Sequence, residues 1–329
     1  MKSLRLTFNE HGKPNEVLRL EEHEVPSPSE GEVLLRMLAS NINPSDLGSI
    51  GGSYGTLPSL PAVAGLEGVA EVEELGHCTS GLKVGDKVRI PSAAGSWQNL
   101  ICTKATNLQS VPKGIPAEQA GSAFVNPPTA LLLLRRIVDL NPGDWIVQNA
   151  ANSAVGIAVI QVAKKLGIRT LNLVRREELT QPLINLGADV VMLDDDQAPK
   201  NFREYTDGKV PRLALNSVGG NSAYRLCKMV VRGGTHVTFG AMTSEATRFP
   251  TRFLIFNDIE LKGFWLTRWL EETGTDSEEL VMDEIFSMIS EGTLKTYIEA
   301  DYSLEEWKTA LEHNAKPRMG KIIFKSSDP

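Results

Sequence analysis

The stretch that decides the fold is WIVQNAANSAVGIAVIQVAKKL, residues 145–166. Its first four residues predict a short buried strand, and Ala154–Leu166 has the apolar spacing of a helix that ends at Gly167. The small residues 149–153 form a tight turn between the two. A strand, a tight turn and a helix start present backbone N–H groups to a ligand, which suits the pyrophosphate of a dinucleotide.

The glycine fingerprint of dinucleotide-binding turns is incomplete here. Ala151, Ser153 and Gly156 occupy the three positions of Gly-x-Gly-x-x-Gly, so only the last, helix-packing glycine remains. On this motif alone, a dinucleotide site and an ordinary α/β turn are equally well supported.

The next predicted strand, residues 170–174, favours one cofactor. It is followed by Arg175 and Arg176, and Arg175 lies nineteen residues after Gly156. An acid at this place holds the ribose hydroxyls of NAD, whereas a guanidinium group binds the 2′-phosphate of NADP with two hydrogen bonds. The alternative is a solvent-exposed arginine pair at a strand end. The position favours NADPH.

The alternation of strands and helices continues through the middle of the chain. Strands are expected at 189–193, 212–217, 235–239 and 259–265, with helices at 177–186 and 222–231. Repeated units of this length predict a parallel, doubly wound sheet.

The two ends of the chain have a different character. Residues 1–125 are rich in proline and glycine, with short strands expected at 33–38, 68–75 and 87–90, which suits a barrel-like domain. Towards the C-terminus we expect an amphipathic helix at 278–290, a helix start at the capping box of Ser303 and Glu306, and a strand at 321–324.

Composition excludes several classes of protein. A length of 329 residues fits about two domains. The net charge of −7 leaves no basic footprint for nucleic acid. Three scattered cysteines favour a reducing compartment, and no apolar run approaches a membrane span. With no secretion signal at its start, the chain is expected to be soluble and intracellular: cytoplasmic if bacterial, mitochondrial if eukaryotic with a transit peptide removed.

Several motifs along nearly the whole chain carry a family resemblance. They are Asn43-Pro44-Ser45-Asp46, Gly52-Ser53-Tyr54-Gly55, Leu60-Pro61-Ala62-Val63, the turn from Gln148 to Gly156, Leu213-Ala214-Leu215-Asn216 and Gly263-Phe264-Trp265-Leu266. With them the chain resembles the zinc-free medium-chain dehydrogenases/reductases, and among these the 2-enoyl thioester reductases. The resemblance implies an α/β protein with a GroES-like, barrel-like catalytic domain at 1–125, completed by 270–329, and a Rossmann domain at 126–269.

The resemblance also implies an activity and a cofactor site. The activity is NADPH-dependent reduction of the 2,3 double bond of trans-2-enoyl thioesters, carried on coenzyme A or acyl carrier protein. The residues implied around NADPH are Asn126, Asn152, Ser153, Ala154, Val155, Gly156, Arg175, Arg176, Phe239, Gly240, Ala241, Met242, Phe264, Trp265, Leu266 and Lys321. One departure is Glu177, where the family has a second arginine, for which Arg176 could compensate.

A conjugate reduction needs a hydride at Cβ, a proton at Cα and a donor to the thioester oxygen. The resemblance nominates Tyr54 as that catalytic donor, whereas a loop tyrosine by itself is usually a half-buried anchor. It also implies a substrate pocket formed by Asn43, Trp265 and Trp97, although a tryptophan at a strand end is more often core. Arg248, Arg252 and Arg268 are candidates for a basic entrance for the carrier's phosphates.

No zinc site is expected. Catalytic zinc needs about three protein ligands. Residues 43–46 contain no cysteine, residues 65–68 contain no histidine, and the adjacent His77 and Cys78 have poor geometry for sharing a metal.

Two other functions stay open, together with one assembly. Quinone oxidoreductases share the fold, NADPH and the lack of zinc, and a binding protein of this superfamily retains NADPH without turnover. The apolar terminal strand at 259–265 predicts a homodimer joined along the Rossmann sheet, because an unpaired edge strand exposes backbone groups.

Overall fold

The computed structural model describes residues 1–106, 108–243 and 245–326. It divides the chain into two compact units, Met1–Val125 with Thr296–Pro329, and Asn126–Lys295. They are called unit 1 and unit 2 below. Among the described helices, none combines the length and the apolar character needed to cross a bilayer.

Unit 2 is built on a six-stranded sheet in the order β10-β9-β8-β11-β12-β13. All five strand pairings are parallel. The chain starts in the middle of the sheet, moves to one edge and returns to build the other, so the strand order reverses between β8 and β11. The predicted doubly wound sheet is confirmed. Its strands are β8 (Trp145–Gln148), β9 (Arg169–Val174), β10 (Val190–Leu193), β11 (Leu213–Asn216), β12 (Thr235–Thr238) and β13 (Glu260–Gly263).

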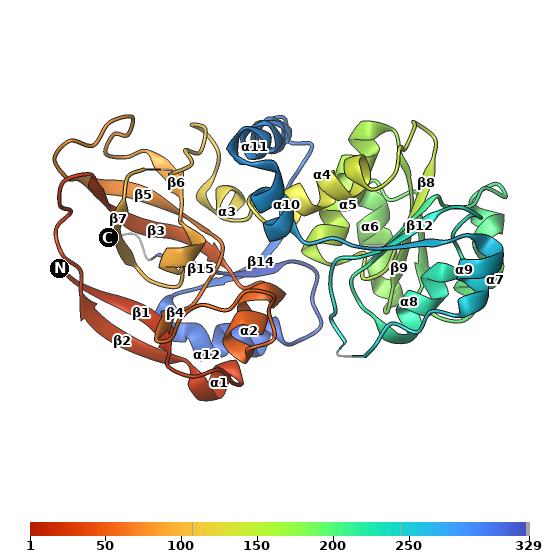
Figure 1. Ribbon diagram of the computed structural model, residues 1–329, viewed down its shortest axis with the longest axis horizontal. Coiled ribbons are helices and arrows are strands. Elements are labelled where there is room, and N and C mark those ends of the chain that lie inside the picture. Colours follow the sequence, from red (N-terminus) through yellow and green to blue (C-terminus); the bar gives the residue numbers. More distant parts are fainter. Residues whose placement is uncertain (107, 244, 327–329) are drawn as a thin grey trace. The chain divides into compact units, whose positions relative to one another are not determined.

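Helices cover both faces of this sheet. Figure 1 shows α5 and α6 on one side of the strands, and α7, α8 and α9 on the other. The core between the layers includes Trp145, Leu171, Leu173 and Phe202. The helices are α4 (Asn126–Arg136), α5 (Ala154–Leu166), α6 (Thr180–Leu186, after the 3-10 turn Glu177–Leu179), α7 (Ala198–Tyr205), α8 (Gly220–Cys227), α9 (Thr251–Asn257), α10 (Leu266–Thr273) and α11 (Thr275–Ser290).

The segment after residue 269 lies with unit 2 as far as Lys295, whereas the sequence placed 270–329 as a whole with the first domain. Arg135 of α4 forms two hydrogen bonds with Glu284 of α11, at 2.5 and 2.6 Å. The side chain of Gln161 in α5 donates to the carbonyl of Lys295 and accepts from its N–H. An amphipathic pattern predicts a helix but does not say which core its apolar face covers.

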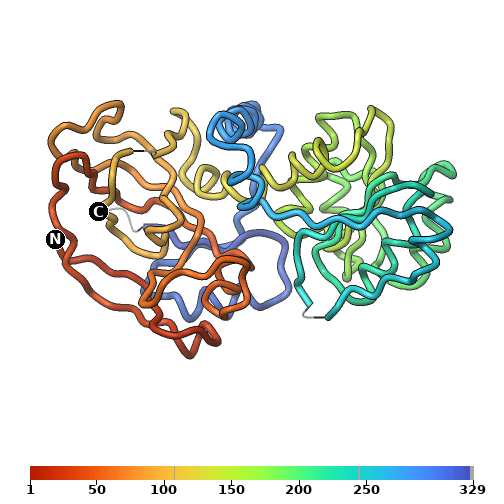
Figure 2. The backbone as a smooth tube through the Cα atoms, in the orientation of Figure 1, coloured from red at the N-terminus to blue at the C-terminus, as the bar shows by residue number. Residues whose placement is uncertain are grey.

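Unit 1 is made from both ends of the chain. Strand β15 pairs antiparallel with β3, with Ile323 opposite Asn41, so a C-terminal strand completes an N-terminal sheet. Figure 2 shows this blue segment running among the red and orange strands. The sheets have the orders β2-β1-β4 and β14-β15-β3-β5-β6, with β7 also on β3.

Unit 1 combines nine strands with short helices of four to eight residues among the described residues. The strands are β1 (Lys2–Phe8), β2 (Arg19–Glu24), β3 (Glu32–Asn41), β4 (Ala62–Val63), β5 (Gly68–Leu75), β6 (Lys87–Arg89), β7 (Leu100–Lys104), β14 (Ile298–Tyr302) and β15 (Lys321–Lys325). The helices are α1 (Pro14–Val17), α2 (Pro44–Gly51), α3 (Ala117–Ala120) and α12 (Trp307–Asn314), with 3-10 turns at Ser92–Ala94 and Leu304–Glu306. The predicted capping box of Ser303 and Glu306 is confirmed.

His236 is a buried titratable group in the core of unit 2. It lies on β12 with 1% of its surface exposed and packs its ring edge-on against Phe249, 5.3 Å between centroids. Among the described atoms, its Nε2 has no hydrogen-bond partner. Burial lowers the pKa of His236 to about 4, so the folded protein holds it neutral.

We predict that His236 makes the protein sensitive to acid. The folded pKa of about 4 lies below the reference value of 6.5, so the unfolded chain takes up a proton first. The stabilisation is therefore complete above about pH 6.5 and is lost as the pH falls towards 4, by about 3 kcal/mol. His236→Gln should flatten this part of the dependence of the unfolding free energy on pH, measured by denaturant titration. His77→Gln, at an exposed position, serves as the control. Parallel pH profiles for the parent and His236→Gln would contradict the prediction.

Candidate functional site

The turn between β8 and α5 is shaped by small residues. Ala150 has a left-handed backbone with φ of 46°. The hydroxyl of Ser153 caps α5 by accepting the N–H of Gly156 at 3.1 Å. A Cβ on Gly156 would lie 2.6 Å from the carbonyl oxygen of Ala151, so only glycine lets the helix start this close to the turn. The one surviving glycine of the fingerprint therefore has the close-packing role expected of it.

A buried amide ties this turn to the neighbouring strand. Gln148, the last residue of β8, is 1% exposed. Its Nε2 donates to the carbonyl of Gly156 at 2.9 Å and to Oδ1 of Asn172 on β9 at 2.7 Å. Through Gln148, the start of α5 is thus hydrogen-bonded to β8 and linked to β9.

The two arginines after β9 have different surroundings. Arg175 is exposed at the carboxyl end of the strand. Arg176 forms an ion pair with Glu178 at 3.0 Å. Glu177 is exposed at the start of the 3-10 turn. Arg175 is consequently the more accessible guanidinium of the pair.

Two further predicted segments follow strands of the same sheet. Residues 239–242 follow β12, and the N–H of Met242 donates to the carbonyl of Ser217 at 2.9 Å. Residues 264–266 follow β13, where the N–H of Phe264 donates to Thr238 at 3.0 Å. Because parallel strands end at one edge, the structure brings residues 149–156, 175–176, 239–242 and 264–266 to the carboxyl edge of one sheet, where α/β proteins bind ligands.

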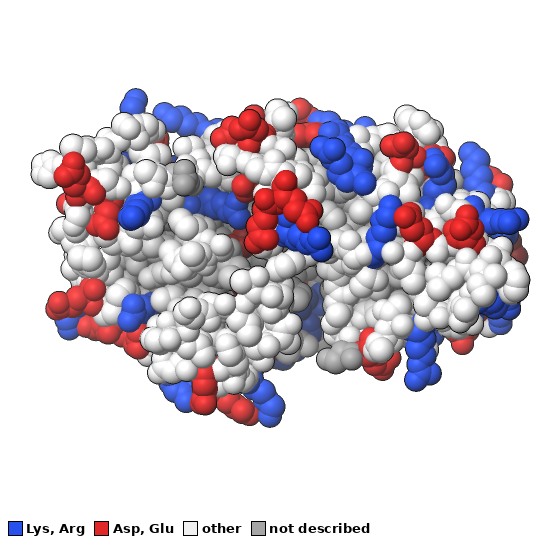
Figure 3. Space-filling model, viewed as in Figure 1, with Lys and Arg blue, Asp and Glu red and all other residues white. Residues whose placement is uncertain are grey.

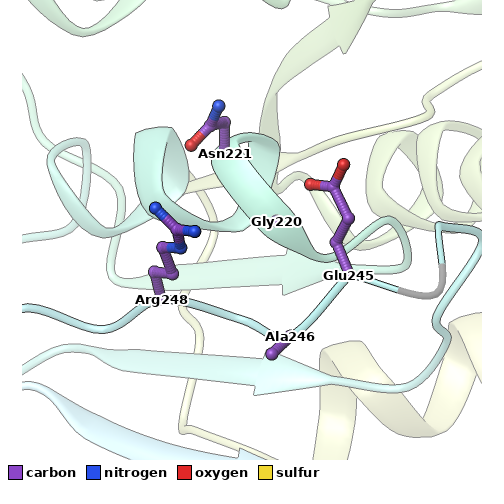
Figure 4. A pocket seen from close by; sticks show the side chains of 5 residues that line it. All are labelled: Gly220, Asn221, Glu245, Ala246 and Arg248. Atoms are coloured by element: carbon purple, nitrogen blue, oxygen red, sulfur yellow. The ribbon is translucent and has the colours of Figure 1, made fainter.

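A cavity of about 420 Å³ opens at the start of α8. Gly220, Asn221, Glu245, Ala246 and Arg248 line it, and Figure 4 shows how their side chains surround it. Of the three arginines considered for a basic entrance, Arg248 lines this cavity. Arg252 lies over the ring of Phe253, and Arg268 pairs with Glu272 at 2.7 Å.

Unit 1 holds a buried carboxylate, Glu67, that is 1% exposed. Its Oε2 accepts the side-chain amides of Asn41 and Asn43, at 2.7 and 2.6 Å. Its Oε1 accepts the backbone N–H groups of Phe124 and Val125, at 2.9 and 2.8 Å. Four N–H donors therefore saturate this carboxylate and fix the last two residues of unit 1 before the chain enters unit 2.

An ammonium group and a second carboxylate lie in the same network. Lys321, 4% exposed, donates to Oδ1 of Asn43 at 2.5 Å. Asp46 accepts backbone N–H groups from Asn43 and Leu66. Burial lowers the pKa of Lys321 to about 8 although Glu67 and Asp46 favour its charge, and burial raises the pKa of Asp46 to about 7. Asn43 was predicted for the substrate pocket and Lys321 for the cofactor. Both lie inside unit 1, and Asn43 is 1% exposed.

Tyr54 lies just after α2, in a stretch without charged side chains. Residues 47–66 contain no Asp, Glu, Lys or Arg, and the surface over α2 is uncharged in Figure 3. The N–H of Tyr54 donates to the carbonyl of Gly48 at 3.2 Å, and its side chain is half-buried. The helix end fixes the backbone of Tyr54 within an uncharged surface.

The two tryptophans and Asn126 differ in burial. Trp97 is fully buried, donates to the carbonyl of Asn41 at 3.0 Å and packs edge-on against Phe324. This burial favours a packing role for Trp97 over a role in the substrate pocket. Trp265 is half-buried after β13. Asn126 is the first residue of α4 and is 8% exposed. Contacts of these residues with a ligand stay predictions.

Comparison with known proteins decides the family. Residues 29–119 match the alcohol dehydrogenase GroES-like domain, and residues 154–286 match the zinc-binding dehydrogenase domain. The chain is 40% identical to the mitochondrial enoyl-[acyl-carrier-protein] reductase of Rattus norvegicus over 95% of this chain and 85% of that protein. It is 39% identical to the Dictyostelium discoideum protein of the same name, over 95% of this chain and 91% of the relative. The chain belongs to the enoyl thioester reductase family.

Solved structures share the complete fold of this family member. The Etr1p/NADP/crotonyl-CoA complex matches with a TM-score of 0.91 and 27% identity, covering 99% of this chain and all of that one. A Bacillus thuringiensis protein described as a candidate NADPH:quinone reductase matches with a TM-score of 0.90 and 26% identity, with the same coverage. The expected GroES-like and Rossmann architecture is confirmed.

The residues present do not fit the zinc that the name of one matching domain suggests. Within the described ranges, no three or more His, Cys, Asp or Glu side chains gather as a metal-binding group. Both oxygens of Glu67 and both of Asp46 already accept N–H donors. The ammonium of Lys321 supplies the positive charge beside them. No catalytic step is therefore assigned to a metal.

Sequence reasoning missed two buried polar residues, Glu67 and Asn149. Glu67 was considered only for the histidine missing beside it, and Asn149 only as part of a motif. A carboxylate within the apolar run around β5 was the available signal for Glu67, because a buried charge needs several hydrogen-bond partners. The four donors come from residues 24 to 58 positions away in the sequence, so they were not predictable from spacing.

Proposed function

We propose that this chain reduces the 2,3 double bond of trans-2-enoyl thioesters with NADPH. The observation that carries the proposal is 40% identity to an enoyl-[acyl-carrier-protein] reductase over 95% of the chain. The match to a complex containing NADP and crotonyl-CoA supports the cofactor and the substrate class. The thioester is carried on coenzyme A or acyl carrier protein. The mitochondrial relatives support that compartment if the chain is eukaryotic.

The carboxyl edge of the unit 2 sheet fits NADPH. Gly156 lets the start of α5 pack against the carbonyls of Ala150 and Ala151, and this helix start supplies N–H groups for the pyrophosphate. Arg175 supplies a guanidinium group for the 2′-phosphate. When bound, NADPH supplies the hydride for Cβ. The other residues proposed to hold it are those of the segments 152–155, 239–242 and 264–266, with Asn126, Arg176 and Lys321.

In unit 1 we assign the reacting hydroxyl to Tyr54. Its O–H donates to the thioester oxygen, where negative charge develops as the hydride reaches Cβ. A proton from solvent then adds to Cα and gives the saturated thioester. A neutral hydroxyl suits the first step because it stabilises the charge without requiring a metal. The stretch 47–66 around it carries no charged side chain that would compete with this hydrogen bond.

Quinone reduction is the second candidate, favoured by the Bacillus thuringiensis neighbour. An NADPH-oxidation assay with crotonyl-CoA, a long-chain enoyl-CoA and a quinone in parallel separates the two. We expect turnover of the enoyl thioesters. Oxidation of NADPH by the quinone alone would select the second function, and NADPH binding without any turnover would indicate a binding protein.

We also propose a homodimer joined through β13. All four residues of this edge strand are exposed, and Leu261 on it is 46% exposed. On the adjacent α9, Ile255 and Phe256 are 65% and 70% exposed. An unpaired edge beside exposed apolar side chains is a surface that a second copy would cover.

The cofactor prediction concerns Arg175. Arg175→Asp should raise the KM for NADPH by about tenfold or more and leave that for NADH nearly unchanged, because a carboxylate repels the 2′-phosphate. Initial-rate kinetics with both cofactors measure this. Arg232→Asp is the control, since Arg232 precedes β12 at the amino edge of the sheet. Equal use of NADPH and NADH by the parent enzyme would contradict the prediction.

The catalytic prediction concerns Tyr54. Tyr54→Phe removes one hydroxyl and keeps the ring, so kcat should fall by about 10²–10³-fold, as for other charge-stabilising donors. NADPH affinity, measured by fluorescence titration, should not change. Tyr205→Phe, at a position 58% exposed, is the matched control. A kcat within about twofold of the parent would remove Tyr54 from the mechanism.

The assembly prediction concerns α9. Ile255→Asp should shift the protein from dimer to monomer in light scattering at micromolar concentration, because burying an unpaired carboxylate in an interface costs several kcal/mol, of order 3–5. Leu280→Asp provides the control, since Leu280 is 72% exposed on α11. A monomeric parent protein would refute the dimer.

A further inference from the structure

A chain of polar side chains connects the carboxyl ends of three strands in unit 2, and no step assigned so far uses it. Asp194, just after β10, accepts a hydrogen bond from Arg225 at 3.2 Å. It also accepts the hydroxyl of Ser222 at 2.5 Å. Ser222 in turn accepts a hydrogen bond from Nδ2 of Asn149 at 2.9 Å. Asn149, directly after β8, is 2% exposed, and the carboxylate side chain of Asp194 is 7% exposed.

The chemistry of these groups fixes the direction of every hydrogen bond. A carboxylate only accepts, so the single hydrogen of Ser222 must go to Asp194. The oxygen of Ser222 is then an acceptor, which requires the NH₂ end of Asn149 to face it. The Oδ1 of Asn149 consequently faces the other way, where it accepts the N–H of Ser217 at 2.9 Å. Asp194 thus supports, through Ser222, the same orientation of the Asn149 amide that the N–H of Ser217 requires.

That amide lies between two segments proposed to hold NADPH. Asn149 immediately precedes Ala150, whose left-handed backbone opens the turn before α5. Ser217, which Asn149 holds through its N–H, accepts the N–H of Met242 through its carbonyl. The second N–H of the Asn149 amide holds Oδ1 of Asn216 at 2.8 Å. If the amide were turned over, its NH₂ group would face the N–H of Ser217, and its oxygen would face Oδ1 of Asn216. Neither pair could form a hydrogen bond.

We propose that Asp194 is a positioning residue for NADPH, acting through Ser222 and Asn149. It holds the turn at 149–153 and the segment at 239–242 in the arrangement that binds the cofactor. This inference rests on the proposed function, because it concerns the site assigned there to NADPH. In this proposal Asp194 acts on the cofactor only through other residues, so its effect falls mainly on cofactor affinity.

The chain offers a matched control for this role. Asp196 also binds Arg225, with its Oδ1 3.0 Å from Nε, but its side chain is 77% exposed. None of its described hydrogen bonds reaches Ser222. Replacing either aspartate removes one negative charge beside Arg225, whereas only Asp194 fixes the Ser222 hydrogen. A difference in NADPH affinity between the two variants therefore reports the hydrogen bonds through Ser222 to Asn149 rather than the ion pair with Arg225.

The test compares Asp194→Asn with Asp196→Asn in the full-length protein. An asparagine at 194 can present an NH₂ group to Ser222, which frees the hydroxyl hydrogen to turn towards Asn149. We expect Asp194→Asn to raise the Kd for NADPH by about tenfold, equivalent to about 1.4 kcal/mol. Titration of NADPH fluorescence measures it without turnover. The KM for NADPH should rise more than kcat falls, and Asp196→Asn should bind NADPH like the parent.

A double-variant cycle tests the route. If Asp194 acts through Ser222, then Asp194→Asn should add little to the loss already produced by Ser222→Ala. Unchanged NADPH affinity in Asp194→Asn, equal losses in both aspartate variants, or fully additive losses would each overturn the proposal. If Asp194→Asn does not fold, Ser222→Ala decides: weaker NADPH binding with an unchanged melting temperature supports the role, and parent-like binding overturns it. If the parent protein binds NADPH but turns over no enoyl thioester, only the proposed function is contradicted, and the positioning role of Asp194 is not.

Discussion

The burial of one carboxylate, Glu67, organises unit 1. A charge this deep is tolerated only when its lone pairs are satisfied, and Glu67 achieves this with four N–H donors from three separate segments. Those segments are the end of β3, the start of α2 and the crossing to unit 2. Asn43 then links the carboxylate to the ammonium of Lys321 on the last strand. Both ends of the chain are therefore joined at the same polar centre, close in sequence to the loop that carries Tyr54.

Unit 2 applies the same principle with amide side chains. Most of the sheet's buried side chains are apolar, His236 being an exception, and amide side chains gather at or near the carboxyl ends of the strands. Gln148, Asn149, Asn172 and Asn216 each satisfy another buried polar group there. An amide has distinct donor and acceptor ends, so such a network specifies one arrangement of the strand ends rather than merely a stable one. That specificity suits a surface that must present backbone N–H groups to a diphosphate.

The sequence predicted those parts of the structure that depend on local patterns. The strand at 145–148, the helix at 154–166 and its end at Gly167 were all predictable, because apolar period, small residues and a left-handed C-cap lie within one stretch. The assignment of residues 270–295 to unit 2 was not predictable, because either core could bury the apolar face of an amphipathic helix. The hydrogen bond between Arg135 and Glu284 also spans 149 positions. The pocket expected at Trp97 meets the same difficulty: burial depends on which strands enclose a side chain, and β15 closes over Trp97 from the far end of the chain.

The arrangement around Arg175 also bears on the departure at Glu177. A carboxylate beside a phosphate site weakens binding only where its charge is close and unscreened. Glu177 is exposed, and Glu178 is engaged by Arg176, so one acid is held by an intervening cation. Arg176 therefore neutralises part of the acidic turn. Under the proposed function, Arg175 supplies the planar donors for the 2′-phosphate, and selectivity for NADPH depends on this one guanidinium group at the end of β9.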